Sequence, residues 1–368
     1  MEFPQEVLRS RLQETTHVVL KLGTGVLTPQ IEQKNQNYFI LLAQEIKKIH
    51  AMGKKVLLVS SGAVGFGRQS FKKKMELKDP LNLVQRQALA SVGQVALMET
   101  YRTIFAYENL TVAQILLSRA DFASRTHYRN IKNTLDQLLE WGCIPIINEN
   151  DPVAISELRF GDNDTLSALI AGMYPQTLLI ILTTVPGFYR NGELVTYLPA
   201  LTSEELRHAK GASLGGTGGM KTKLLAAERI LVAGQVMVIA SGQNPAIISD
   251  LLAAKPCGSW FFNPQNVKEL SDRKRYLIHQ RHTEGKLVID LGARQALEQK
   301  TASLLLVGIH EVYGDFSKNA VVDVFAQSEL VARGFVSLSA KELRQLLPHK
   351  KAMRGLEVIH RDNMVLLT

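Results

Sequence analysis

The chain has 368 residues, 46% hydrophobic and 21% charged, which is an ordinary globular balance with enough apolar material for two domains. Its two cysteines, Cys143 and Cys257, exclude a disulfide scaffold and favour free thiols in a reducing compartment. No apolar run is long enough to span a membrane, and residues 1–16 lack the apolar core of a signal peptide, so we expect a soluble, cytoplasmic protein. The net charge of +9 suits an anionic ligand, and indicates nucleic acid only weakly because there is no arginine-rich tract.

The first two-thirds of the chain alternate apolar strands with amphipathic helices. In chain order, we expect strands at 17–22, 56–59, 112–117, 144–147, 178–182 and 236–240. The expected helices are 38–52, 83–107, 121–141, 165–173 and 218–233. Three of these helices are followed or closed by a glycine, a common C-terminal stop. This alternation predicts an α/β fold with a mostly parallel sheet sandwiched by helices.

The pattern changes after residue 262. Residues 263–276 contain a proline, two asparagines and a group of charges, as a linker would. Beyond it we expect short strands at 287–290, 304–307, 320–325 and 330–336, with a short helix at 340–346. The sequence therefore predicts an α/β domain over 1–262, a linker over 263–276 and a small β-rich domain over 277–368.

Two strand ends carry residues suited to anions. The first strand ends in Lys21-Leu22-Gly23-Thr24-Gly25, where the lysine projects from the carboxyl edge of the sheet and the glycines allow close approach of a phosphate. This order is neither a Walker A loop nor a Rossmann fingerprint, and a plain turn would also explain it. The second ends in Ser60-Ser61-Gly62, which can bind a carboxylate or simply cap a helix.

A dense polar cluster follows the strand at 144–147. It comprises Asn148-Glu149-Asn150-Asp151 and Gly161-Asp162-Asn163-Asp164, with a possible hairpin at 153–160 between them. Such acceptors suit the ammonium group of an amino acid, a Mg²⁺ ion or the orientation of a lysine. A polar turn with a helix cap would explain Asp162 or Asp164 but not the whole set, so we interpret the cluster as functional.

The most unusual segment is glycine-rich and precedes a helix. It reads Gly215-Gly216-Thr217-Gly218-Gly219-Met220-Lys221-Thr222-Lys223. Lysines at a helix N-terminus oppose the helix dipole, which favours a nearby anion such as a nucleoside triphosphate over a flexible loop. These parts together fit phosphoryl transfer, where catalysis is mostly positioning and charge neutralisation. A carboxylate acceptor needs no general base because it is already ionised near neutral pH.

The ordered set of motifs resembles the amino acid kinase family over nearly the whole chain. It comprises KLGTGVLT, VSSGAVGFGR, ASVGQ, QILLSRAD, INENDPVA, FGDNDTLSA and GTGGMKTKLLAA. Arg273-Lys274-Arg275 and the β-rich module that follows resemble a PUA domain, a fold also found in RNA-modifying enzymes. The closest similarity is to the members that use Mg-ATP to phosphorylate the side-chain carboxylate of L-glutamate, the first step of proline biosynthesis. Mg²⁺ would arrive with the ATP phosphates rather than on protein ligands.

The resemblance also implies residue roles. Lys21 would contact the transferring phosphate, Lys223 would stabilise its charge, and Asp164 would orient both lysines. Glutamate would be held by Ser61, Asp151 and Asn163, with Asp162 close by. The ATP site would be lined by Lys21, Gly23, Thr183, Thr184, Thr217, Gly218, Gly219, Met220, Lys221, Thr222 and Lys223.

Two positions depart from the family pattern. Thr184 stands where the family usually has Asp, and Gly25 where it commonly has Ser. We expect activity to survive both changes, with altered nucleotide affinity. The resemblance further implies inhibition by proline at the glutamate site and a homo-oligomer, a dimer or a tetramer. Direct transfer of the labile acyl phosphate to a glutamyl phosphate reductase is a hypothesis.

Two alternatives stay open from the sequence. One is another kinase of the family, acting on acetylglutamate or aspartate, against which the C-terminal module and the FGDND motif speak. The other is a sensor of proline or glutamate that binds RNA through the module, and its support is Thr184 alone. With 16 basic and 12 acidic side chains, residues 263–368 are weakly basic for an RNA surface.

Overall fold

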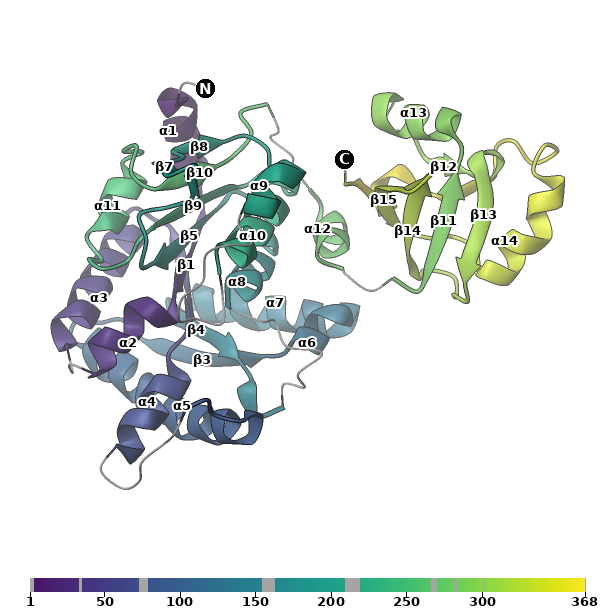
Figure 1. Cartoon of the computed structure of the whole chain (residues 1–368). Helices are drawn as coiled ribbons and strands as arrows, with labels where there is room; N and C mark the ends of the chain where they lie inside the picture. Colours follow the sequence, from purple (N-terminus) through teal and green to yellow (C-terminus); the bar gives the residue numbers. More distant parts are fainter. Residues whose placement is uncertain are drawn as a thin grey trace. The chain divides into compact units, whose positions relative to one another are not determined.

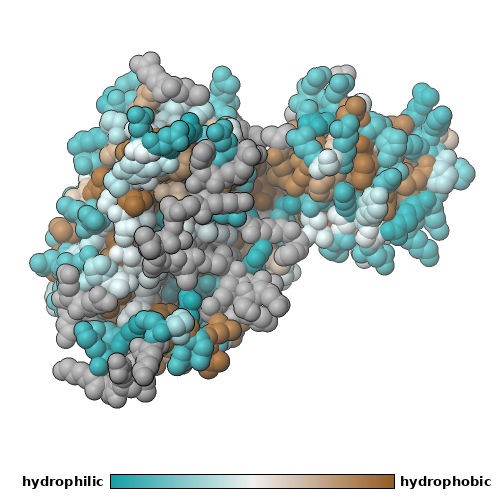
Figure 2. Space-filling view, in the orientation of Figure 1, coloured by the Kyte–Doolittle hydropathy of each residue, from teal (hydrophilic) through white to brown (hydrophobic). Residues whose placement is uncertain are grey.

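The computed structural model describes residues 3–32, 35–72, 79–153, 163–208, 219–265, 270–280, 283–300 and 302–367. The chain folds as two compact units, Met1–Glu269 and Leu270–Thr368 (Figure 1). No helix within these described ranges is long and apolar enough to cross a membrane. On the visible face of the first unit most described residues are hydrophilic and the hydrophobic ones are scattered (Figure 2), as on most protein surfaces.

The first unit is built on a sheet with the strand order β3-β4-β2-β1-β5-β9-β10-β8. Its strands are β1 (His17–Leu22), β2 (Lys55–Ser60), β3 (Val112–Leu117), β4 (Ile144–Glu149), β5 (Thr177–Thr183), β8 (Tyr197–Leu198), β9 (Val236–Ser241) and β10 (Ser259–Phe261). Every pairing is parallel except that of β10 with β9. The predicted mostly parallel sheet is therefore confirmed. A separate ribbon pairs β6 (Tyr189–Arg190) with β7 (Glu193–Leu194).

Helices cover both faces of this sheet, as the fully buried strands require (Figure 1). Alternate side chains of β1 point to opposite faces. Val18, Leu20 and Leu22 pack in a core with side chains of five helices: α1 (Gln5–Glu14), α2 (Thr24–Glu32), α3 (Gln36–Ala51), α5 (Leu83–Ala106) and α11 (Ile247–Leu252). The opposite face, to which Lys21 points, is covered by α7 (Arg125–Glu140), α8 (Asn163–Gly172) and α10 (Met220–Val232).

Some helices differ from the sequence-based expectation. The single helix expected over 121–141 is two, α6 (Arg119–Ala123) and α7. Ser124 separates them because its backbone is extended and its side chain accepts a hydrogen bond from the N–H of His127, which caps α7. The sequence analysis also did not predict α2 (Thr24–Glu32), because a glycine and a proline lie within that segment. The shorter helices α4 (Ala63–Phe71) and α9 (Ser203–His208) complete this unit.

The second unit is β-rich, as predicted. One sheet has the order β13 (Ile309–Gly314), β11 (Gly285–Ile289), β14 (Val321–Ala326), β15 (Glu329–Phe335), β17 (Met364–Leu366). A second sheet pairs β12 (Leu304–Leu305) with β16 (Glu357–Ile359). Its helices are α12 (Asp272–His279), α13 (Leu291–Lys300) and α14 (Ala340–Leu346). The sequence reading proposed α14 alone, and α12 begins inside the segment expected to be a linker.

A largely buried ion pair ties the chain that follows α12 to this sheet. The Nε of Arg333, on β15, donates to Oδ1 of Asp323, on β14, at 2.7 Å. Nη1 of Arg333 donates to the carbonyl oxygens of Gln280 and Leu277. The hydroxyl of Thr283 donates to the other oxygen of Asp323 at 2.9 Å. The guanidinium of Arg333 is thus paired with the single carboxylate of Asp323, and both groups make further hydrogen bonds.

Candidate active site

Three charged side chains meet at the carboxyl edge of the large sheet. Nζ of Lys21, on β1, lies 2.5 Å from Oδ1 of Asp164, on α8. Nζ of Lys223, on α10, lies 2.9 Å from Oδ2 of the same carboxylate. The three side chains are at most 7% exposed. The structure therefore brings together Lys21, Asp164 and Lys223, a group we call the lysine–aspartate cluster.

The charges of this cluster do not balance. Burial by itself would raise the pKa of Asp164, but the two lysines outweigh it and hold the pKa well below its usual range. Asp164 is therefore ionised at any physiological pH. Two ammonium groups then face one carboxylate in a water-poor site, where an excess charge is costly. An anion bound beside the lysines would relieve this cost, which makes the cluster a candidate phosphate site.

Helix ends place the members of the cluster. Asp164 lies in the first turn of α8, where a negative charge is favoured by the helix dipole. Lys223 lies in the first turns of α10, where a positive charge is disfavoured unless an acceptor is near. Asp164 is that acceptor, and the hydroxyl of Thr222 also lies 2.9 Å from its Oδ2. Thr222, expected to line the nucleotide site, thus contacts the carboxylate of Asp164.

A chain of amide side chains leads away from Asn163, the residue before Asp164. Its Nδ2 lies within 3.2 Å of three acceptors, the backbone oxygen of Ser60, the hydroxyl of Ser61 and Oδ1 of Asn148. Nδ2 of Asn148 in turn donates to Oε1 of Gln94, on α5, at 3.0 Å. The structure therefore joins the predicted residues Ser61 and Asn163 to Asn148, a member of the predicted polar cluster, and it adds Gln94, to which the sequence analysis gave no role.

Backbone groups fix which way each amide points. The oxygen of Ser60 can only accept, and the N–H of Glu149 can only donate, which it does to Oδ1 of Asn148. Asn148 must then turn its nitrogen toward Gln94, and Gln94 must turn its own nitrogen away. That atom, Nε2 of Gln94, is buried and has no hydrogen-bond partner among the described residues. A buried amide donor without a partner indicates a place for an acceptor.

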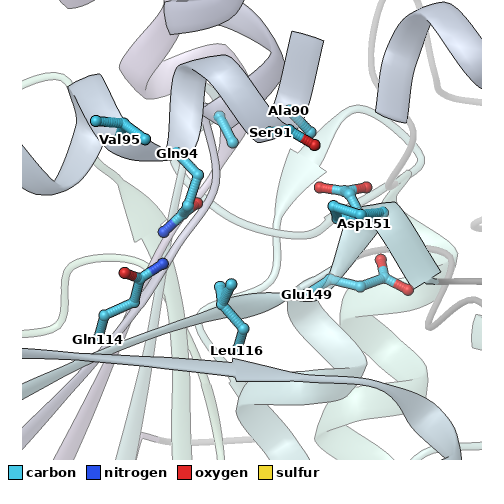
Figure 3. Close-up of a pocket in the computed structure, with 10 residues that line it drawn as sticks. Ala90, Ser91, Gln94, Val95, Gln114, Leu116, Glu149 and Asp151 are labelled. Atoms are coloured by element: carbon cyan, nitrogen blue, oxygen red, sulfur yellow. The ribbon is translucent and has the colours of Figure 1, made fainter. Parts of the chain in front are cut away.

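Gln94 borders an open cavity of about 270 Å³. Its polar lining comprises Ser91, Gln94, Gln114, Glu149 and Asp151. Figure 3 shows the amides of Gln94 and Gln114 pointing toward one another, and the carboxyl groups of Glu149 and Asp151 at the other end of the opening. Amide donors on one side and carboxylates on the other complement a molecule that carries both a carboxylate and an ammonium group.

Two glycines allow this wall of the cavity to form. A Cβ on Gly93 would lie 1.7 Å from the backbone oxygen of Ala63, and one on Gly67 would lie 2.0 Å from that of Leu89. Helices α4 and α5 can therefore pack this closely only because both positions lack a side chain. The close contact brings Ala63, at the start of α4, and Gln94 to the same cavity. In the ASVGQ motif the glycine therefore allows the two helices to pack closely, and the glutamine hydrogen-bonds to Asn148 and borders the cavity.

The residues expected on the nucleotide side lie where β1 and β5 end. The N–H of Gly23 donates to the backbone oxygen of Leu182, so Gly23 offers space rather than a donor. The N–H groups of Thr24 and Gly25 open α2 and have no backbone acceptor among the described residues. Thr183 and Thr184 follow on the neighbouring strand end. This edge therefore presents unpaired donors beside Lys21, as a phosphate site requires.

The remaining predicted residues are placed in part. Asp151 borders the cavity, while Gly219, Met220 and Lys221 lie at the start of α10, with Lys221 exposed. Asp162, Thr217 and Gly218 lie outside the described residues, as does nearly all of the hairpin expected at 153–160. Within the described ranges, no group of three or more His, Cys, Asp or Glu side chains could hold a metal ion.

Two family models match the chain. The amino acid kinase family model matches residues 16–241, which contain the whole lysine–aspartate cluster. The PUA domain model matches residues 285–357, within the second unit.

Curated relatives match over nearly the full length. The chain is 37% identical to a glutamate 5-kinase of Geobacter sulfurreducens, over 97% of this chain and 99% of the relative. It is 39% identical to one of Herpetosiphon aurantiacus, over 95% of this chain and 97% of the relative. A third, from Methylobacillus flagellatus, is 38% identical over 98% of this chain and all of its own length.

Proposed function

The chain belongs to the glutamate 5-kinase branch of the amino acid kinase family, and from this premise we propose that it transfers the γ-phosphate of ATP to the side-chain carboxylate of L-glutamate. The observation that carries the proposal is the lysine–aspartate cluster, in which two buried lysines exceed one carboxylate. Transfer between two anions, ATP and a carboxylate, needs this excess of positive charge to bring them together.

The reaction follows from the placement of these groups. A carboxylate oxygen of glutamate forms a bond to the γ-phosphorus, the bond from that phosphorus to the bridging oxygen breaks, and ADP leaves with the electron pair. No proton moves, because the acceptor is already ionised. We assign Lys21 to the phosphoryl group in transfer and Lys223 to the charge that develops on the nucleotide side. Asp164 holds both ammonium groups in place through its two oxygens.

Glutamate is proposed to lie between the cavity and the cluster. Glu149 and Asp151 would face its ammonium group, and the unpartnered Nε2 of Gln94 would donate to its α-carboxylate. Ser61 and Asn163 would then hold the side chain, since Asn163 directly precedes Asp164 in α8. Asp162 is proposed to lie near the same substrate.

A kinase that uses ATP works with a divalent metal ion, and we propose Mg²⁺. The described residues offer no cluster of ligands for it, so the ATP phosphates would supply its coordination. The ion would neutralise phosphate charge. Lys21 and Lys223 would complete that task from the protein side.

The proposal is tested by ATP turnover with hydroxylamine, which converts an acyl phosphate into a hydroxamate. We expect hydroxamate with L-glutamate and Mg²⁺, and none above background with L-aspartate or N-acetylglutamate. Hydroxamate from one of the other acceptors alone would assign a different kinase of the family. A folded protein that binds ATP and yields no hydroxamate from any acceptor would overturn the kinase assignment.

Other partners are proposed on the same basis. Proline carries a carboxylate and a ring ammonium group on the same α-carbon, as glutamate carries its α-groups, so it would fit the end of the cavity proposed for those groups. We propose that it inhibits by competition, which a rise in the KM for glutamate with unchanged kcat would support. A homo-oligomer and delivery of the product to a glutamyl phosphate reductase are proposed from the family alone.

A further inference from the structure

The two positions that depart from the family pattern lie against each other. Gly25 is in the first turn of α2, and a Cβ built on it would lie 2.9 Å from Cγ2 of Thr184. Carbon atoms in proteins essentially never approach so closely. The side chain of Thr184 therefore fills the space that a side chain at position 25 would need. Residues 159 positions apart in sequence share one small volume.

Hydrogen bonds hold the backbone on both sides of this contact. The N–H of Gly23 donates to the oxygen of Leu182 at 3.0 Å, which ties the start of α2 to β5. The oxygen of Thr183 accepts from the N–H of Gly242 at 2.7 Å, which ties the end of β5 to that of β9. Neither segment can move away without breaking one of these bonds, so a side chain added at position 25 has to displace that of Thr184.

The shared volume lies among groups suited to phosphate. The N–H groups of Thr24 and Gly25 have no backbone acceptor among the described residues. Thr184 is exposed, and within the described ranges its hydroxyl makes no hydrogen bond. Nζ of Lys21 lies 3.7 Å from the place that a Cβ on Gly23 would take. A hydroxyl donor, two amide donors and a cation thus lie along one strand edge.

We propose that Gly25 and Thr184 act as one unit in the nucleotide site: the missing side chain at position 25 admits Thr184, whose hydroxyl donates to the phosphates of ATP. This rests on the proposed function for the identity of the nucleotide. Thr184 is the specificity-determining residue, and Gly25 is the positioning residue that keeps its side chain in place.

The first part of the test distinguishes the effect of the space at position 25 from the effect of the hydroxyl at position 184. Gly25→Ala should push the Thr184 side chain aside and raise the KM for ATP about tenfold. Thr184→Ser keeps the hydroxyl and removes the methyl group, and should raise that KM less than about threefold. The double variant should return to within about threefold of Thr184→Ser, because its serine leaves room for the new methyl group. The proposal would be overturned if the increase in the KM for ATP of the double variant equalled the product of the increases in the two single variants.

The second arm tests the hydroxyl itself. Thr184→Val keeps the shape and removes the donor, so it should raise the KM for ATP about tenfold and leave the KM for glutamate within about twofold. A Thr184→Val variant with unchanged nucleotide affinity would overturn the assigned role. Thermal unfolding serves as the fold control, and Gly25→Ala should not lower the unfolding temperature, since alanine favours a helix.

Calorimetry of Mg-ADP binding without glutamate measures nucleotide affinity independently of turnover. It is applied to the same four variants: Gly25→Ala, Thr184→Ser, their combination and Thr184→Val. The dissociation constants should show the same rescue in the double variant as the KM for ATP. If the protein binds Mg-ADP with this pattern but forms no hydroxamate, the glutamate kinase assignment fails and the coupled pair stands. If turnover is normal and the rescue is absent from both readouts, the coupled pair fails alone.

Discussion

Each unit of the molecule buries a group of opposite charges, and the two groups are built differently. In the second unit, Arg333 meets Asp323 one to one, and two backbone oxygens take further donors of the guanidinium. In the first unit, Lys21 and Lys223 share the single carboxylate of Asp164. The pair in the second unit is complete without a ligand, whereas the cluster in the first unit keeps, among the described residues, one positive charge without a matching carboxylate.

The difference indicates how a structural ion pair can be told from a functional one. A buried pair that satisfies its own charge and donors can hold elements together, as Arg333 does for the residues that follow α12. A buried group with an excess charge costs stability unless something else supplies the counter-charge. Burial alone does not separate the two cases, because both groups are largely removed from water.

The strongest test of this comparison removes one lysine. Lys223→Met should lower kcat by about 10²- to 10³-fold and change the KM for glutamate less than about threefold, because the lost charge acts on the transferring group. The hydroxamate assay measures both constants. Lys47→Met removes an exposed lysine that pairs with Glu108 and serves as the matched control. Full turnover in Lys223→Met would remove its assigned role.

The second unit should respond in stability instead. Arg333→Met leaves Asp323 buried without its cation and should lower the free energy of unfolding of this unit by about 3 kcal/mol. Faster amide hydrogen exchange in β14 and β15 would report it, and kcat should stay within about twofold. Replacing both partners, as Arg333→Met with Asp323→Leu, should restore part of the loss. An effect of Arg333→Met on kcat as large as that of Lys223→Met would break the comparison.

His17 sharpens the comparison because it is a half-buried basic group for which burial outweighs the attraction of Asp136, and it lies at the opposite end of β1 from Lys21. Burial and, to a smaller extent, Lys55 lower its pKa from 6.5 to about 4, and its ring stacks on Tyr174 at 4.2 Å. The folded state thus disfavours the charged form. Its contribution is present above pH 6.5 and is lost as pH falls through 4, by about 2 kcal/mol after allowance for partial exposure.

Urea unfolding of wild type and His17→Phe at several pH values between 7 and 4 measures this loss. The stability difference between the two proteins should shift in favour of the phenylalanine variant as the pH falls. A difference independent of pH would show that His17 titrates alike in the folded and unfolded chain.

The smallest expected effect concerns the uncharged part of the site. Gln94→Glu keeps an acceptor for Asn148 and replaces the unpartnered donor by a carboxylate oxygen. The KM for glutamate should rise about tenfold, which corresponds to about 1.4 kcal/mol, with the KM for ATP unchanged. The control is Gln137→Glu at an exposed position of α7, since Gln87 contacts the turn at Asp151 and is a poorer match. An unchanged KM for glutamate in Gln94→Glu would leave the donor without a role.

Much of the sheet and the charged cluster could be predicted from the sequence. Apolar strands of β-branched residues and leucine, ending in Lys21 or in a serine pair, identify a parallel sheet and its carboxyl edge. The amide chain could not be found this way. Gln94 lies on the buried side of a long helix, and nothing in its neighbours signals a polar partner on β4.

The contact between Gly25 and Thr184 was equally hidden. Each position could be noted as unusual, but local patterns describe neighbours in the chain, and this contact joins the ends of two strands. The division of the helix at Ser124 was missed for a related reason. A capping serine and an ordinary helical serine look alike until the backbone beside them is known.

The position of β1 in the sheet has a consequence for synthesis. It is the first strand to leave the ribosome, yet it lies in the middle of the strand order, between β2 and β5. Lys21 is therefore synthesised well before its partners: Asp164 follows it, and Lys223 comes about 200 residues after it. At typical elongation rates that is roughly 10 to 40 s. A chain that stops short of α10 lacks Lys223 and so has an incomplete lysine–aspartate cluster, and nucleotide binding on the ribosome would mark the point at which α10 has packed into the first unit.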